Sequence, residues 1–253
     1  SDVCSSDLLN KTAKLFIAST IAILALAGLY AFLFISMRKN LIIVPVGKPV
    51  DHFINQTGYP VKVEDHWRWT KNERNYDIMA VQYSDYVPEE GSYDDLCYIP
   101  GFKWTILKQL YKVIDFSQYD YVGLYDDDVI IDYCSMNSGF ELAKQKDFPA
   151  FQISLAAGSE SSYPCTQNMP GVEYTDTNFI EVMCPVFRKD TLVKVMELIN
   201  QYDIYTGWGL DYVLSEWINS YVNVIHDVKM FHPPRPDTGS GDRKSTRLNS
   251  SHT

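Results

Sequence analysis

The chain has 253 residues, of which 46% are apolar, and its 32 acidic against 22 basic side chains give a formal net charge of −10. This composition is ordinary for a folded domain and excludes a collagen-like or wholly disordered chain. The excess of acids argues against a nucleic-acid partner, because phosphate backbones are bound by a surplus of Lys and Arg.

The two ends of the chain differ from the rest. Residues 1–8 read SDVCSSDL and residues 242–252 read DRKSTRLNSSH, and both strings resemble translated short-read sequencing adapter. We therefore expect residues 1–8 and 242–253 to be artefacts and exclude them from the fold prediction. On this interpretation the natural protein continues beyond both ends.

An uncharged apolar run occupies residues 15–37, with two basic residues on each side. As a helix rising about 1.5 Å per residue it would be about 34 Å long, enough to cross a hydrocarbon core of about 30 Å. The run is longer than the apolar part of a signal peptide, and no small-residue cleavage site is evident. It predicts one transmembrane helix within an N-terminal segment, 9–39.

The orientation of this helix is less well defined by the sequence, because the basic residues are balanced across it. A short tail before the helix favours a domain outside the cytosol, and Asn55-Gln56-Thr57 forms a glycosylation sequon compatible with that side. We therefore expect a single-pass membrane protein, in the Golgi or another secretory compartment of a eukaryotic cell or in the inner membrane of a bacterium.

Strand-like and helical patterns alternate after the anchor. In chain order we predict strands at 41–46 and 78–83, a helix at 105–114, a strand at 121–124, a helix at 138–144 capped by Ser138, a strand at 151–155, a helix at 190–199, and a helix that Asp211 opens and that runs through Trp217. This alternation indicates an α/β fold with a mixed, mostly parallel central sheet flanked by helices. Residues 156–177, rich in Gly, Ser and Pro, are predicted to be a long functional loop.

Four cysteines lie between the two adapter-like ends: Cys97, Cys134, Cys165 and Cys184. None of them forms a C-x-x-C pair, so their spacing does not indicate a zinc site. They are predicted to be either buried thiols or structural disulfides.

The sharpest motif is Asp126-Asp127-Asp128, directly after the predicted strand 121–124. In an open α/β sheet, ligands bind at the carboxyl ends of strands, and alternation along the chain points Asp126 and Asp128 to one side and Asp127 to the other. Adjacent carboxylates repel one another and are stabilised by a cation. Hard oxygen ligands suit Mg²⁺ or Mn²⁺, particularly beside a diphosphate. The alternative is a solvated acidic turn.

Two further motifs carry candidate functional residues. In TGWGLD at 206–211, two glycines allow a close backbone approach to a ligand. Asp211 there is either a general base for an acceptor hydroxyl or an ordinary acid at a helix N-terminus. In FHPPRP at 231–236, His232 is a candidate metal ligand and Arg235 a candidate phosphate contact, although a lone His is more often structural.

Taken together, six blocks of the chain resemble the family described as "domain of unknown function 707". They are LIIVPVG at 41–47, GFKW at 101–104, YDYVGLYDDDVII at 119–131, NFIEVMCPVF at 178–187, TGWGLDYVL at 206–214 and HPPRP at 232–236. Members of that family look like metal-dependent nucleotide-sugar glycosyltransferases of the A-type fold. The resemblance implies a catalytic domain of this nucleotide-diphospho-sugar transferase type over residues 40–241.

The resemblance also implies roles on the donor side of such a site. Asp126 and Asp128 match the acid-x-acid motif of A-type transferases and would hold Mn²⁺ or Mg²⁺, with His232 as a further ligand. Asp127 would contact the ribose of the nucleotide or support a metal ligand through a hydrogen bond.

Four other residues receive roles in the same way. Lys103 and Arg235 would contact the phosphates of the nucleotide sugar, Asp211 would face the acceptor, and Glu181 is a weaker acceptor-side candidate whose alternative is an ordinary acid at a strand edge.

The predicted function is therefore a membrane-anchored, divalent-metal-dependent glycosyltransferase that moves a hexose from a nucleotide sugar to a glycan or other hydroxyl acceptor. A cation on two carboxylates stabilises the charge that grows on the leaving diphosphate. Whether the reaction inverts or retains the anomeric centre stays open. Two alternatives remain: a non-catalytic sugar- or nucleotide-binding module of the same fold, and a phosphohydrolase with Asp126 as its nucleophile.

Overall fold

The computed structural model describes residues 40–69, 72–161, 163–207 and 209–234. The predicted membrane helix at 15–37 and both adapter-like ends lie outside these residues. Within the described ranges, no helix combines the length and the hydrophobicity needed to cross a membrane.

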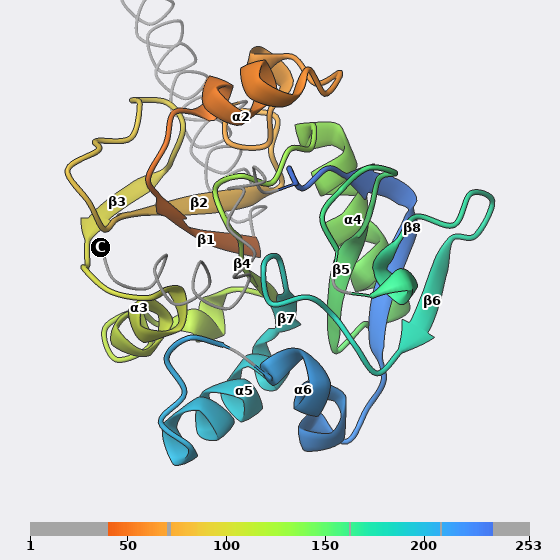
Figure 1. Ribbon diagram of the computed structural model, residues 1–253. Coiled ribbons are helices and arrows are strands. Elements are labelled where there is room, and N and C mark those ends of the chain that lie inside the picture. The colour runs from red at the N-terminus through yellow and green to blue at the C-terminus, as the bar shows by residue number, and fades with distance from the viewer. Residues whose placement is uncertain (1–39, 70–71, 162, 208, 235–253) are drawn as a thin grey trace, which may run out of the picture. The chain divides into compact units, whose positions relative to one another are not determined.

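The described residues form one mixed sheet of eight strands in the order β3-β2-β1-β4-β7-β5-β8-β6 (Figure 1). The strands are β1 (Asn40–Val46), β2 (Tyr76–Gln82), β3 (Asp95–Tyr98), β4 (Tyr121–Leu124), β5 (Ala150–Leu155), β6 (Tyr174–Thr177), β7 (Val186–Arg188) and β8 (Val222–Met230). The pairs β1–β2, β1–β4, β2–β3 and β5–β8 are parallel, whereas β4–β7, β5–β7 and β6–β8 are antiparallel. The predicted mixed α/β sheet is thus confirmed.

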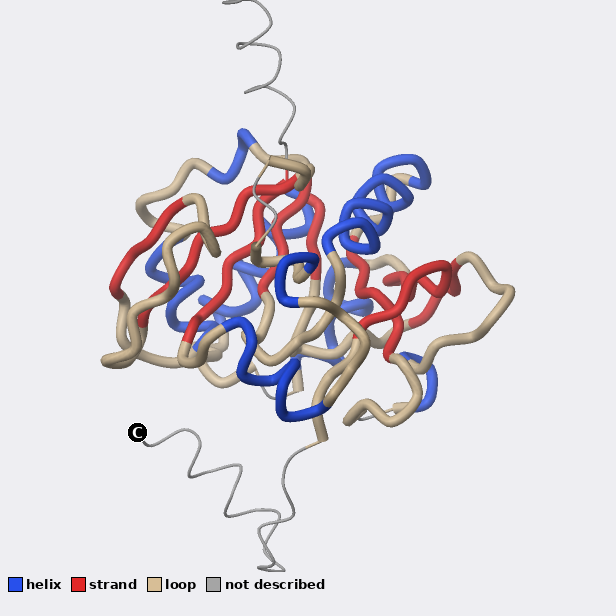
Figure 2. The backbone as a smooth tube through the Cα atoms, turned by 90° about the horizontal axis from the view of Figure 1, so that it is seen from above, coloured by secondary structure: helices blue, strands red, loops and turns tan. Residues whose placement is uncertain are grey.

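Helices cover both faces of this sheet (Figure 2). They are α2 (Val50–Thr57), α3 (Lys103–Leu110), α4 (Tyr133–Lys146), α5 (Lys189–Gln201) and α6 (Leu210–Ile218). Successive side chains of a strand point to opposite faces, so Leu41 and Ile43 pack in the core with α3, α5 and α6, and Ile42 and Val44 in the core with α4. Because β1 is covered on both faces, its sequence is a continuous apolar run.

The predicted elements are present, but several of their boundaries are wrong. The helix predicted at 105–114 spans Lys103–Leu110, and the strand predicted at 78–83 spans Tyr76–Gln82. The helix predicted at 138–144 begins earlier, at Tyr133, because the Asp132 side chain accepts the backbone N–H of Ser135 (2.8 Å) and caps the helix there. Ser138 lies inside the helix and donates its hydroxyl to Cys134 O. The predicted loop 156–177 ends in β6, a polar edge strand that pairs with β8.

The four cysteines of the described residues are free thiols, and Cys184 is fully buried among apolar side chains. The predicted disulfides are therefore not formed, and the alternative of buried thiols holds for Cys184, whereas Cys134 is exposed and Cys97 and Cys165 are partly buried.

Candidate active site

The acidic motif lies at the carboxyl edge of the sheet. β1 and β4 are parallel neighbours, so the turn at Gly47 and the motif at 126–128 follow the two strands at the same edge. The backbone N–H of Asp126 donates to Met183 O (2.8 Å), and Ile130 and Phe231 exchange two backbone hydrogen bonds of 2.8 Å each. The motif is thus held between two segments that are distant in the sequence.

Lys103, at the start of α3, is the cation beside the first acid of the motif. Its Nζ lies 2.7 Å from Asp126 Oδ1 and also donates to the backbone oxygens of Val182 (2.6 Å) and Met183 (3.2 Å). Partial burial raises the pKa of Asp126, and the Lys103 ammonium opposes that rise. The structure therefore brings Lys103 to the acidic motif, and its contact with a phosphate stays a prediction.

His232, just after β8, faces the third acid of the motif. Its Nε2 lies 3.5 Å from Asp128 Oδ2, and its Nδ1 lies 3.3 Å from Glu160 O. Since a backbone oxygen can only accept, Nδ1 carries a proton and Nε2 is the nitrogen that faces the acid. Burial by itself lowers the pKa of His232, but the hydrogen bond and charge of Asp128 outweigh it and raise that pKa. Burial by itself raises the pKa of Asp128, but the hydrogen bond and charge of His232 outweigh burial and bring that pKa below its usual value.

Asp127 points away from this group. Its Oδ2 accepts the backbone N–H groups of Gly47 (2.7 Å) and Lys48 (3.0 Å), in the turn that follows β1. Partial burial raises the pKa of Asp127 to about 6, although these two donors favour its charged form. The structure therefore shows the predicted division of the three acids, and a contact of Asp127 with a ribose stays a prediction.

The carboxylate oxygens of Asp126 and Asp128 fit a hard divalent cation such as Mn²⁺ or Mg²⁺, whereas the softer imidazole of His232 fits Mn²⁺ better than Mg²⁺. Asp128 Oδ1 is buried and has no hydrogen-bond partner among the described residues, which leaves its lone pairs for a ligand. No group of three His, Cys, Asp or Glu side chains in those residues is gathered closely enough to hold a metal ion by itself. Further oxygens, such as those of a diphosphate, would have to complete the coordination.

A buried arginine adjoins the motif on the side of Asp127. Arg68 is 0% exposed, and its guanidinium nitrogens have no hydrogen-bond partner in the part of the chain that the structure describes. Its Nη2 lies 3.8 Å from Glu89 Oε2, and Glu89 Oε1 accepts the backbone N–H of Val50 (3.3 Å). The charge of Arg68 also acts on Asp127 and favours its ionised form. The carboxylates of Asp127 and Glu89 thus accept backbone N–H groups at and just after the turn that follows β1, and the positive charge of Arg68 interacts with both acids.

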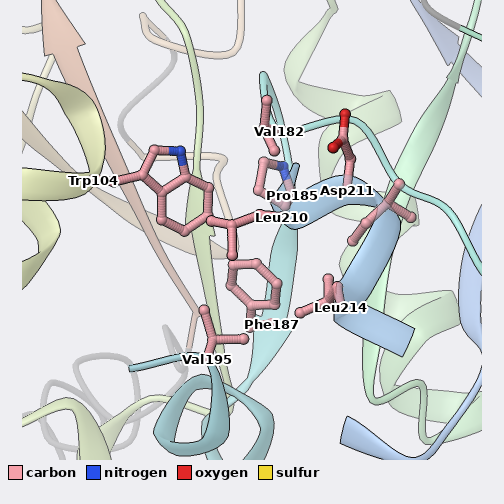
Figure 3. Close-up of a pocket in the computed structure, with 9 residues that line it drawn as sticks. Trp104, Val182, Pro185, Phe187, Val195, Leu210, Asp211 and Leu214 are labelled. Atoms are coloured by element: carbon pink, nitrogen blue, oxygen red, sulfur yellow. The ribbon is translucent and has the colours of Figure 1, made fainter. Parts of the chain in front are cut away.

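Asp211 and Glu181 form a second pair of acids. Asp211 lies in the first turn of α6, and its carboxylate points away from the apolar side chains of a small pocket that includes Trp104 and Leu210 (Figure 3). Asp211 Oδ1 is buried without a hydrogen-bond partner among the described residues. Glu181 is 7% exposed and accepts the Thr166 hydroxyl (3.0 Å). Burial raises the pKa of Asp211, and the nearby charge of Glu181 adds to the rise.

The first glycine of the TGWG motif, Gly207, allows a close contact with Trp104 that a larger residue would prevent. Gly207 has φ +78°, and a Cβ added there would overlap the indole of Trp104, next to Lys103 on α3. The close approach joins the GFKW and TGWG segments of the chain. Trp208 and Arg235 lie outside the described residues, so the phosphate contact of Arg235 stays a prediction.

Some side chains at this edge of the sheet were not singled out by the sequence analysis. Arg68 has a usable signal, because it stands between two tryptophans in the triplet Trp67-Arg68-Trp69, where a charge is expected to be buried. Tyr163 and Tyr212, which adjoin Asp211, have none, since the chain contains 18 tyrosines without a pattern that separates these two.

Comparison with known proteins gave matches among solved structures alone: no protein-family profile and no curated protein matches the chain. The fold is similar to S. aureus TarS 1–349 in complex with UDP-GlcNAc, with a TM-score of 0.48 and 10% identity over 79% of this chain and 59% of that one. It is also similar to TarS 1–349 in complex with UDP, with a TM-score of 0.48 and 11% identity over 77% of this chain and 60% of that one. The chain therefore spans about three fifths of the length of these structures.

Proposed function

We propose that this protein is a membrane-anchored glycosyltransferase that moves a hexose from a nucleotide sugar to a hydroxyl group of a glycan or other acceptor and that depends on Mn²⁺ or Mg²⁺. The observation that carries the proposal is the grouping of Asp126, Asp128, Lys103 and His232 at the carboxyl edge of the sheet. Ligands of open α/β sheets bind at this edge, and two acids with a neighbouring cation suit a diphosphate with its metal ion.

On the donor side, Asp126 and Asp128 would hold the cation, with the His232 imidazole as a further ligand. When bound, the metal ion stabilises the negative charge of the departing diphosphate. The Lys103 ammonium, held by two backbone oxygens, stays beside Asp126 and adds positive charge for the phosphates. The two oxygens fix the position of this charge before the ligand arrives, so little reorganisation is required.

On the acceptor side, Asp211 takes the proton of the attacking hydroxyl if the reaction inverts the anomeric centre. A raised pKa makes a carboxylate a stronger base, and both burial and the charge of Glu181 raise the pKa of Asp211. Glu181 itself is held by the Thr166 hydroxyl and acts on Asp211 through its charge.

The membrane part of the proposal is supported by the uncharged run at 15–37 alone. A single span of this kind places the domain at a membrane surface, in the Golgi or another secretory compartment in a eukaryote and at the inner membrane in a bacterium.

Thermal melting of the purified chain, kept in a mild detergent because of the apolar run, tests the donor site. We expect uridine or guanosine diphosphate to raise the melting temperature when Mn²⁺ is present and not when either is added alone. A ligand at about a hundred times its Kd stabilises by about 2.7 kcal/mol, which corresponds to a shift of several degrees in a domain of this size.

Two variants make this measurement specific. The double substitution Asp126→Asn, Asp128→Asn should abolish the shift, whereas Asp120→Asn, at the amino end of the same strand β4, should leave it unchanged. Absence of a shift with either nucleotide in folded protein would contradict the donor site. A shift without sugar transfer or hydrolysis would instead favour the non-catalytic binding module.

A further inference from the structure

An exposed cluster of aromatic rings lies beside the acceptor-side acids. Tyr163, Phe179 and Tyr212 form this cluster, with ring centroids 4.6 Å apart for Tyr163–Phe179 and 5.5 Å apart for the other two pairs. Phe179 is 6% exposed and forms the base, whereas Tyr163 and Tyr212 are 38% and 57% exposed. We call these three residues the aromatic surface.

The aromatic surface joins two separate elements. Tyr163 belongs to the loop after β5 and Tyr212 to the first turn of α6, and their hydroxyl groups are hydrogen-bonded to each other. The two rings pack edge to face, at an interplanar angle of 87°. This contact holds both rings in fixed orientations, so a ligand that stacks on them loses little side-chain entropy.

Acids adjoin the aromatic surface on the side of α6. Asp211 precedes Tyr212, and its Oδ1 has no hydrogen-bond partner among the described residues. Glu181 follows Phe179 by two residues and acts electrostatically on both Asp211 and Tyr212. Rings with a few nearby polar groups are the usual lining of a small-molecule site.

A short stretch of chain connects the aromatic surface to the acidic motif. Phe179 is the base of the surface, and the backbone oxygens of Val182 and Met183 hold Lys103, which pairs with Asp126. From Phe179 to Met183 the chain spans at most about 14 Å. Because Met183 O also accepts the backbone N–H of Asp126 (2.8 Å), this stretch limits how far the aromatic surface can lie from the acidic motif.

The charge of the region limits the class of ligand. The carboxylate of Asp211 repels an anionic acceptor, and its buried Oδ1 has no hydrogen-bond partner among the described residues. A neutral sugar has C–H faces that pack on an aromatic ring and hydroxyl groups that donate to carboxylates. Both features are met here by Tyr163, Tyr212 and Asp211.

We propose that the aromatic surface binds a neutral sugar ring of the acceptor, so that the acceptor of the proposed transferase is a glycan. The part of this inference that concerns transfer rests on the proposed function, whereas the binding of a sugar ring at Tyr212 does not. The surface would place one hydroxyl of that ring toward Asp211.

Saturation-transfer NMR on the purified full chain tests the binding step without a donor. The probes are the methyl glycosides of glucose, galactose, mannose, xylose and N-acetylglucosamine, together with cellobiose and lactose. We expect saturation of the C–H protons of at least one probe. Tyr212→Leu should weaken that binding about tenfold or more, which is about 1.4 kcal/mol. Tyr212→Phe keeps the ring and should retain most of the binding.

Tyr98→Leu is the matched control, because Tyr98 is 65% exposed but lies on the edge strand β3 at the other end of the sheet. If Tyr212→Leu fails to fold, nitration of the wild-type chain replaces it: a bound probe should slow nitration of Tyr212 and leave that of Tyr98 unchanged. No saturation of any probe, equal binding by Tyr212→Leu, or binding of serine- or threonine-containing peptides instead of sugars overturns the proposal.

The two proposals fail in different ways. Loss of the nucleotide- and metal-dependent melting shift, with sugar binding intact, contradicts the donor site alone. A normal melting shift without sugar binding contradicts the aromatic surface alone.

Discussion

The three acids of the motif at 126–128 differ in the groups that their carboxylates contact. The carboxylate of Asp126 faces Lys103, and that of Asp128 faces His232. The carboxylate of Asp127 instead accepts two backbone N–H groups of the turn after β1. A middle acid of this kind links the position of Asp126 and Asp128 to the fold. In the proposed site, the order of the three carboxylates separates metal binding by Asp126 and Asp128 from the structural support given by Asp127.

Arg68 is the residue through which this support is best tested. The substitution Arg68→Met removes the buried charge that Asp127 and Glu89 share. The pKa of Asp127 is already raised to about 6, above its usual value in an unfolded chain, so its ionisation lowers stability as pH rises through that value. Without Arg68 the pKa should rise further. We expect the loss of unfolding free energy to be larger at about pH 8 than at about pH 5, by on the order of 1 kcal/mol.

Urea unfolding at the two pH values measures this difference. The control is Arg68→Met in an Asp127→Asn background, where no carboxylate at position 127 remains to titrate, so the dependence on pH should largely vanish. An equal loss at both pH values in the single variant would show that Arg68 does not act on Asp127.

At the scale of elements, burial on both faces decides which strands the sequence can predict. β1 and β4 are nearly continuous apolar runs, and β5 is fully buried although it contains Gln152 and Ser154; the predicted bounds of all three agree with the structure within one residue. β3 and β6 are short edge strands of four residues each without a buried side chain, and β8 contains His226, Asp227 and Lys229. These three form through pairing with neighbours, which a local pattern does not contain.

The contact between α3 and the turn before α6 gives a prediction at this scale. Gly207→Ala adds a Cβ that overlaps the Trp104 indole at a φ of +78°. Gly58→Ala is the matched control, because Gly58 has φ +65° with nothing within 4 Å of an added Cβ. We expect the control to lose about 1 kcal/mol of unfolding free energy from the backbone term alone, and Gly207→Ala to lose about 1–3 kcal/mol more. Equal losses in chemical denaturation would show that the Trp104 contact has no energetic weight.

For the whole molecule, the sequence predicts where the acidic motif lies better than it predicts which side chains pair with the motif. A strand that ends in three acids indicates the carboxyl edge of an α/β sheet, and the motif lies there. The pairs Lys103–Asp126 and Asp128–His232 join segments far apart in the chain, and they depend on the pairing of Ile130 with Phe231 and on the carbonyls of Val182 and Met183. Contacts of this range follow from the topology of the sheet and not from any local pattern.

The stability of the whole domain should fall in acid because of one histidine next to the site. His66 is 1% exposed; its Nε2 lies 3.2 Å from Val129 O, and its Nδ1 accepts the backbone N–H of Arg68 (3.3 Å). Both contacts require the neutral ring with its proton on Nε2, because a protonated Nδ1 could no longer accept. Burial, helped by the charge of Arg68, lowers the pKa of His66 to about 3.

A base whose pKa is lowered in the folded state binds fewer protons than in the unfolded chain, so its contribution is present above the unfolded pKa of about 6.5 and is lost as pH falls below it. We expect His66 to remove about 1.4 kcal/mol of unfolding free energy per pH unit between about pH 6 and pH 4. Urea unfolding of wild type and His66→Gln, in which the amide keeps a donor and an acceptor, measures the difference. Asp127 titrates in both proteins with the opposite sign, so comparing the two slopes isolates His66. Equal slopes would mean that the imidazole is protonated in the folded protein without loss of its two contacts.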